Sequence, residues 1–217
     1  MGLSAAALVP LPWFSEFTVQ ILSGRTEGTD YINSHNASDN VFLAHYRNLW
    51  DLSEDLTAEF GLSGATGKND FALTNGNLQS GNTYLYNADL TFKWRPVEGG
   101  KYHALIWSTE YTNRQVSRPS SSNVGQGYAS WLQYQFAERW WAQVRSEYLR
   151  VLDTDKIAPL QIQPYQRKYS ALLGFFPSEF SGFRLQYDNL NDGQDTNEQR
   201  ISLQGNFTIG AHPAHAY

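Results

Sequence analysis

Thirteen charged or titratable residues alternate with apolar residues along the chain, and their types and spacing give them the clearest chemical potential. Neighbouring residues of a β-strand point to opposite faces of the sheet, so these thirteen should share one face while most of the aromatic side chains lie on the other. If that face lines the lumen of a barrel, its fixed charges set the field that a permeating solute meets. The residues are Glu16, His45, Arg47, Glu59, Asp89, Lys93, Glu110, Arg145, Glu147, Lys168, Arg184, Asp188 and Arg200.

Two interpretations of this charged set stay open. Apart from His45, basic and acidic residues are equal in number, so the set can line a polar lumen with opposed charge clusters that orient solutes. It can equally form cross-strand ion pairs that fill a narrow barrel, as the shared face of Arg145 and Glu147 suggests. A balanced set also argues against phosphate selectivity, which requires a ring of Arg or Lys.

Enzyme and metal chemistry find little support in the sequence. Alternation places His103 on the face opposite Ser108 and Glu110, so the three cannot form a catalytic triad. His212 and His215 are three residues apart around a proline and have no adjacent carboxylate, which is a weak zinc pattern. We therefore predict no catalytic residue, no metal site and no cofactor.

The composition narrows the class of protein. Of the 217 residues, 15% are aromatic and only 17% are charged, and cysteine is absent. No window approaches the roughly 20 apolar residues of a membrane-spanning helix. The net charge of −5 argues against nucleic-acid binding, which normally requires a basic excess. The chain length favours a single domain covering residues 1–217.

Period-2 alternation predicts an all-β fold of about ten strands from Trp13 onward, with a weaker strand over residues 4–9 that pairs with residues 13–22. Short turns are expected near residues 52–54, 95–100, 137–139 and 177–182. Long polar loops are expected near residues 23–40, 65–82, 114–126, 151–166 and 189–198. Short turns on one rim and long loops on the other are typical of an outer-membrane barrel.

The positions of the aromatic residues favour a membrane barrel over a soluble ligand-binding barrel, in which the apolar side chains would point inward. Residues 82–95 carry aromatics at both ends and aliphatics between them, as expected for two interfacial girdles around an aliphatic band. The sequence therefore predicts an antiparallel up-and-down transmembrane β-barrel of about 10–12 strands. The expected interface aromatics are Tyr84, Trp94, Trp107, Tyr128, Trp140, Tyr148, Tyr169 and Tyr187.

The C-terminal segment resembles the closing strand of Gram-negative outer-membrane proteins. Residues 200–210 alternate in polarity, and the chain ends on the aromatic Tyr217. In that class the barrel-assembly machinery recognises such an end. The resemblance therefore implies that Phe207, Ile209 and Tyr217 form an assembly signal.

Three further segments, residues 11–16, 93–96 and 210–217, look like the C-terminal part of proteobacterial porin-like proteins that are loosely related to phosphate-selective porins O and P. The resemblance implies a location in the bacterial outer membrane, in contact with lipid and lipopolysaccharide. Relatives of this kind are longer, so a single barrel and the C-terminal part of a longer one are both consistent with it.

The expected function is that of a porin-like channel for passive diffusion of small hydrophilic solutes. A second possibility is a non-conducting structural or minimised barrel whose lumen is filled by side chains. A third is the soluble ligand-binding barrel.

Overall fold

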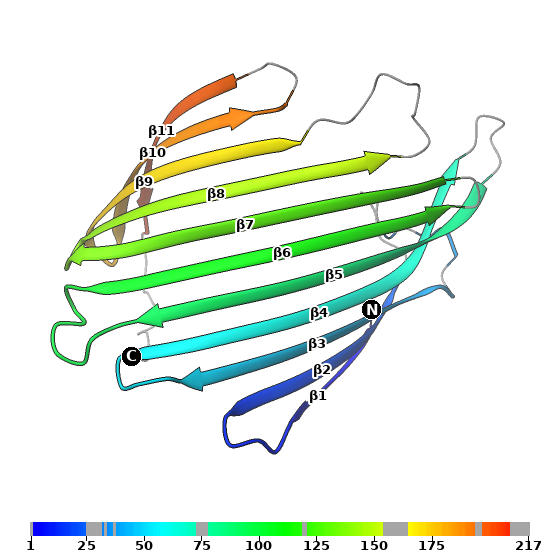
Figure 1. The fold of residues 1–217 in the computed structure, drawn as a ribbon, viewed down its shortest axis with the longest axis horizontal. Helices are drawn as coiled ribbons and strands as arrows, with labels where there is room; N and C mark the ends of the chain where they lie inside the picture. The colour runs from blue at the N-terminus through cyan, green and yellow to red at the C-terminus, as the bar shows by residue number, and fades with distance from the viewer. Residues whose placement is uncertain are drawn as a thin grey trace.

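The computed structural model of the chain is a single antiparallel sheet of eleven strands (Figure 1). It describes residues 2–24, 32, 34–36, 38–72, 78–118, 121–153, 165–193 and 197–208. The strands are β1 (Gly2–Leu8), β2 (Phe14–Ser23), β3 (Asn40–Asp51), β4 (Leu56–Ala72), β5 (Leu78–Trp94), β6 (Ala104–Arg118), β7 (Ser121–Ala137), β8 (Trp140–Asp153), β9 (Gln166–Ser178), β10 (Ser181–Asn191) and β11 (Asn197–Phe207).

Each strand pairs with its neighbours in the chain, so the spatial order is β1 to β11 without a crossover. The predictions of an all-β, up-and-down antiparallel fold and of 10–12 strands are confirmed. Within the described ranges the pairing ends at β1 and β11, which do not pair with each other, so the sheet is open rather than closed into a barrel.

The predicted weak first strand is present as β1, and all seven of its residues pair with β2. The connection between the two strands contains Pro10 and Pro12, which cannot donate a backbone hydrogen bond to a sheet. Trp13 holds this connection against β3, because its indole Nε1 donates a hydrogen bond to Asn48 Oδ1 at 3.0 Å. Its ring also lies 6.2 Å from the ring of Trp50.

Two of the five predicted long loops are mostly strand. Residues 65–72 and 78–82 belong to β4 and β5, and residues 114–118 and 121–126 belong to β6 and β7. Their Gly, Ser, Asn and Thr content is typical of loops, but the hydrogen-bonded ladder between partners continues through it. The central four strands are consequently 15 to 17 residues long.

The strand pairing assigns side chains to two faces, because residues in direct register lie on the same side of a sheet. The face that carries Phe17, Leu62, Leu132 and Leu185 is called the apolar face, and the other is called the polar face. The edge with the connections after β1, β3, β5, β7 and β9 is called the turn rim. The opposite edge is called the loop rim.

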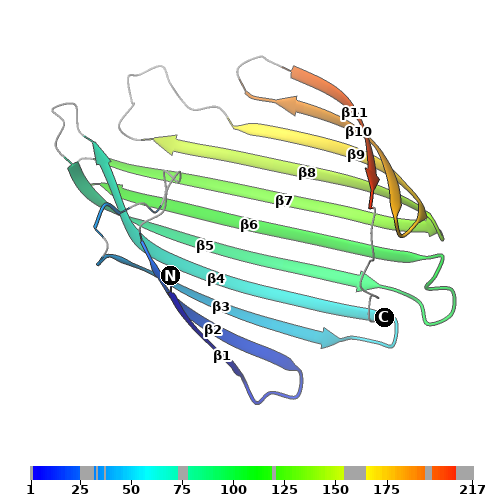
Figure 2. The same ribbon diagram turned by 180° about the vertical axis from the view of Figure 1, so that it is seen from behind.

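The sheet is a single curved layer, and nothing in the described ranges packs over the apolar face as a second layer (Figure 2). Buried apolar residues in those ranges are limited to Val41, Ala58, Ala104 and Val116. The accessible surface is 14756 Å², whereas a compact soluble monomer of this mass exposes about 10,000 Å². No helix among the described residues is long and apolar enough to cross a membrane.

Candidate functional site: the polar face

The register places all thirteen charged or titratable residues singled out from the sequence on the polar face. Direct pairs link them across the sheet: Glu16 lies opposite Arg47, Asp89 opposite Glu110, Glu147 opposite Lys168, and Asp188 opposite Arg200. The polar face therefore carries a band of charge that runs from β2 to β11. Within this band the structure separates two ion-pair clusters from a central region of different character.

The first cluster is centred on Glu59 of β4. Arg47 Nε on β3 lies 2.8 Å from Glu59 Oε1, and Lys93 Nζ on β5 lies 3.6 Å from Glu59 Oε2. One carboxylate thus joins cations from both flanking strands. Because the side chains of Arg47 and Lys93 are each about half exposed, their charges remain accessible to solvent.

The second cluster extends over β8, β9 and β10. Glu147 accepts a hydrogen bond from Arg145 Nη2 at 2.6 Å and lies 3.7 Å from Lys168 Nζ. Lys168 also lies 3.4 Å from Asp188 Oδ1, which accepts a hydrogen bond from Ser170 Oγ at 2.5 Å. The charges alternate in sign along this chain of contacts, so the cluster is close to neutral.

The region between the clusters brings two carboxylates together. Asp89 of β5 lies directly opposite Glu110 of β6. Glu110 accepts a hydrogen bond of 2.6 Å from Asn87 Nδ2. Asp89 lies over Gly61 so closely that a methyl group there would overlap its carboxylate. Glycine at position 61 therefore makes room for the Asp89 side chain.

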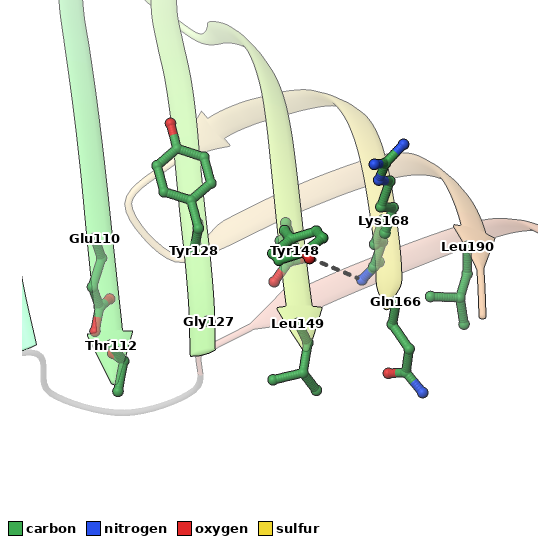
Figure 3. A pocket seen from close by; sticks show the side chains of 12 residues that line it. Glu110, Thr112, Gly127, Tyr128, Tyr148, Leu149, Gln166, Lys168 and Leu190 are labelled. Carbon is green, nitrogen blue, oxygen red and sulfur yellow. Dashed lines mark ion pairs between the residues drawn. The ribbon is translucent and has the colours of Figure 1, made fainter. Parts of the chain in front are cut away.

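A pocket of about 400 Å³ lies beside this central region, toward the loop rim (Figure 3). Gly127 of β7, which has no side chain, and Ala129, which has only a methyl group, line it, and a Cβ added to Gly127 would meet no atom within 4 Å. Glu110 lines the pocket from β6, and Glu147 with Lys168 from β8 and β9. The strip of small residues thus lies between charged side chains of both signs.

The remaining predicted residues of the polar face have individual environments. His45 Nδ1 lies 2.8 Å from Ser63 Oγ on the adjacent strand. Arg200 Nη2 lies 2.6 Å from Glu198 on the exposed edge strand. Arg184 lines a separate pocket near the turn rim together with Trp141.

The residues that we excluded as a triad are apart in the structure. His103 precedes β6, and its Nδ1 lies 3.2 Å from the Tyr134 hydroxyl, whereas Ser108 Oγ lies 2.8 Å from Thr91 Oγ1. In the part of the chain that the structure describes, no group of three or more His, Cys, Asp or Glu side chains is arranged to hold a metal ion. His212 and His215 lie outside the described residues.

All eight predicted interface aromatics lie on the apolar face. Several are in mutual register, such as Tyr128 opposite Tyr148, and Phe92 stacks on Trp107 with ring centroids 5.6 Å apart. Of the expected assembly signal, Phe207 ends β11 and packs edge-on against Phe183. Ile209 and Tyr217 lie outside the described residues.

Several polar residues of the site were not among those predicted from the sequence. Asn87, Ser170 and Gln186 hold the carboxylates of Glu110 and Asp188 through hydrogen bonds. Alternation places these residues on the polar face, but only the strand register shows which carboxylate each one contacts. Selecting uncharged polar residues at alternate positions would have found them as a group.

Comparison with known proteins found no relative of this chain. No protein-family model matches the chain, and neither the curated proteins nor the solved structures contain a match.

Proposed function

We propose that the sheet closes into a transmembrane barrel of the bacterial outer membrane and acts as a porin-like channel. The channel passes ions and other small hydrophilic solutes by diffusion, with the polar face as its lumen and the apolar face toward lipid and lipopolysaccharide. The barrel-assembly machinery would insert it. The proposal includes no enzymatic step, no cofactor and no nucleic-acid partner.

The exposure of the apolar face supports a lipid environment. Large apolar side chains such as Phe42, Tyr86 and Leu185 are about half exposed, although they lie within a regular sheet. A soluble protein rarely leaves a continuous apolar surface of this extent open to water. In a bilayer the same surface is favourable, because the hydrocarbon of the lipid replaces the missing second layer.

The observation that carries the proposal is a diagonal apolar belt. On β3 its middle is Ala44, and on β10 its middle is Leu185. When directly paired residues are followed from strand to strand, Trp50 of β3 leads to Tyr187 of β10, so these two residues lie at the same level across the sheet. Relative to this level, Ala44 lies six residues toward the loop rim, whereas Leu185 lies two residues toward the turn rim.

The belt moves steadily between these two strands. Its middle on β5 is Ala88, four residues to the loop side of the same level, and its middle on β8 is Val144, at that level. Eight residues of displacement span about 26 Å, and the seven strand spacings from β3 to β10 span about 34 Å. A belt parallel to a membrane therefore requires strands tilted by about 38°, within the range of transmembrane barrels.

Conductance across planar lipid bilayers tests the proposal. Protein refolded in detergent and added to the bilayer should give discrete current steps. Folded protein that gives no steps would overturn the channel function. A chain that stays soluble and monodisperse without detergent would overturn the membrane location itself.

The ion-pair clusters favour one alternative, a non-conducting barrel of structural role. Eleven strands lie between the barrels of about eight strands that side chains fill and the barrels of 16 to 18 strands that leave a channel. Ion pairs that reach across several strands, such as Arg47–Glu59–Lys93, can close a lumen of that size. Folded, membrane-inserted protein that gives no current steps is the result expected for this alternative.

A further inference from the structure

The two edge strands of the sheet run in the same direction. Every neighbouring pair from β1 to β11 is antiparallel, so all odd-numbered strands run from the loop rim to the turn rim. Closing an antiparallel meander with an odd number of strands therefore joins two parallel strands. We propose that β1 and β11 of the same chain form such a parallel seam, an inference that rests on the proposed membrane barrel.

Both edges present backbone groups that a bilayer cannot satisfy. Each N–H or C=O left unpaired in hydrocarbon costs several kcal/mol, which is why spanning sheets close. On β11, Ile201 and Leu203 are 75% and 79% exposed, and Leu3 on β1 is 77% exposed. These values exceed those of apolar residues on the inner strands, because one flank of each edge strand lacks a neighbour.

The C-terminal edge already turns out of the plane of the central strands. The turn-rim end of β11 passes behind β8 and β9 in Figure 1 and in front of them in Figure 2. A sheet with this curl needs more curvature of the same kind, rather than a new fold, to bring β11 beside β1.

The apolar belt specifies the register of the seam, because the belt must meet itself around the barrel. Its middle on β1 is Ala5, and on β11 it lies at Leu203 to Gly205. From each strand to the next, the middle of the belt moves about one residue toward the turn rim. The middle on β1 should therefore lie one residue closer to the turn rim than the middle on β11, which places Ala5 beside Gly205. Leu3 then lies beside Leu203, and Ala7 lies beside Phe207.

This register also matches the polar face. It places Ser4 beside Gln204, and both side chains can form hydrogen bonds. In the structure Ser4 Oγ already accepts a bond of 3.2 Å from Gln20 on β2. A displacement by one residue would instead put polar side chains of one strand on the apolar face of the other, so only even displacements are compatible with the seam.

Disulfide trapping tests the seam directly, because the chain has no cysteine of its own. The double variant S4C/Q204C is refolded into phosphatidylcholine vesicles, oxidised with copper phenanthroline and analysed on a non-reducing gel. We expect an intrachain bridge that forms several-fold faster than in S4C/L203C, since residue 203 points to the other face. S4C/Q20C and R184C/Q204C, which are direct pairs within the sheet, serve as positive controls.

The possible outcomes separate the seam from the channel. If both positive controls bridge and current steps are present, but S4C/Q204C forms no bridge or bridges only between chains, the seam is wrong and the channel proposal stands. Bridging of S4C with S202C or N206C in place of Q204C would overturn the proposed register. Failure of both positive controls together with the absence of current would overturn the barrel and the seam.

Discussion

The polar and apolar faces of the sheet differ in what their side chains touch. On the polar face, Glu59, Glu147 and Asp188 each contact cationic side chains from neighbouring strands. On the apolar face, side chains such as Leu132 and Val144 lie beside one another but leave much of their surface open. The charged clusters of the polar face thus find counter-charges within the chain, whereas the described residues leave much of the apolar face uncovered.

Placing a positive charge on each face in turn should give the largest difference in the free energy of unfolding. Leu132 lies near the middle of the apolar belt and is 40% exposed. Leu132→Arg should lower the free energy of unfolding in lipid vesicles by about 2–4 kcal/mol, because the guanidinium would enter hydrocarbon. The matched variant Gln133→Arg changes the adjacent residue on the polar face and should cost much less. Equal losses in urea titrations of the two variants would mean that the faces are assigned wrongly.

Removing a carboxylate should reveal how far the polar face depends on its internal pairs. Glu59→Gln leaves Arg47 and Lys93 without their shared counter-charge, and should cost about 1 kcal/mol because both cations are partly hydrated. Its control is Glu198→Gln, which breaks the exposed pair with Arg200 and should cost nothing measurable. Urea unfolding in vesicles measures both, and a larger loss for the control would contradict the difference between the two environments.

Neutralising one of the central carboxylates should stabilise the protein instead of destabilising it. Asp89→Asn removes a like charge from directly opposite Glu110, and should raise the free energy of unfolding by a few tenths of a kcal/mol. It should also shift the selectivity of the channel toward anions, read as the reversal potential across a bilayer in a salt gradient. A loss of stability together with an unchanged reversal potential would show that Asp89 serves a purely structural role.

The smallest effect is expected at the turn rim, where neither face is involved. A hydrogen bond from Lys101 lowers the pKa of Glu138, and the two side chains lie 2.8 Å apart. A lowered folded-state pKa contributes stability at neutral pH that disappears as the pH falls through that value. Both groups are exposed, so the contribution should be slight and screened by salt. Carboxyl NMR titration should show a higher pKa for Glu138 in Lys101→Met; an unchanged value would contradict the assigned cause.

Alternation in the sequence predicted the strands and their two faces, because the period of two is a property of the extended backbone. It could not predict which residues meet. Glu59 binds Lys93, 34 residues further along the chain, and that contact depends on the register between β4 and β5. Register depends on turn lengths and on pairing over the whole sheet, which a local pattern does not contain.

The predicted loop boundaries failed for a related reason. Asn69, for example, lies in a segment with the composition of a loop, yet it is buried in β4. Composition reports the preference of one segment, whereas a strand forms when a second segment offers a matching ladder. The open edge at β11 is likewise invisible in the alternation, because β11 carries the same alternating pattern as the inner strands.

The odd number of strands also has a topological consequence. Gly2 lies at the loop rim and Phe207 at the turn rim, so the two ends of the sheet are at opposite rims. In a membrane, polypeptide attached before β1 and polypeptide attached after β11 would face different compartments. The sheet would then act as a connector across the bilayer, holding one appended segment on each side.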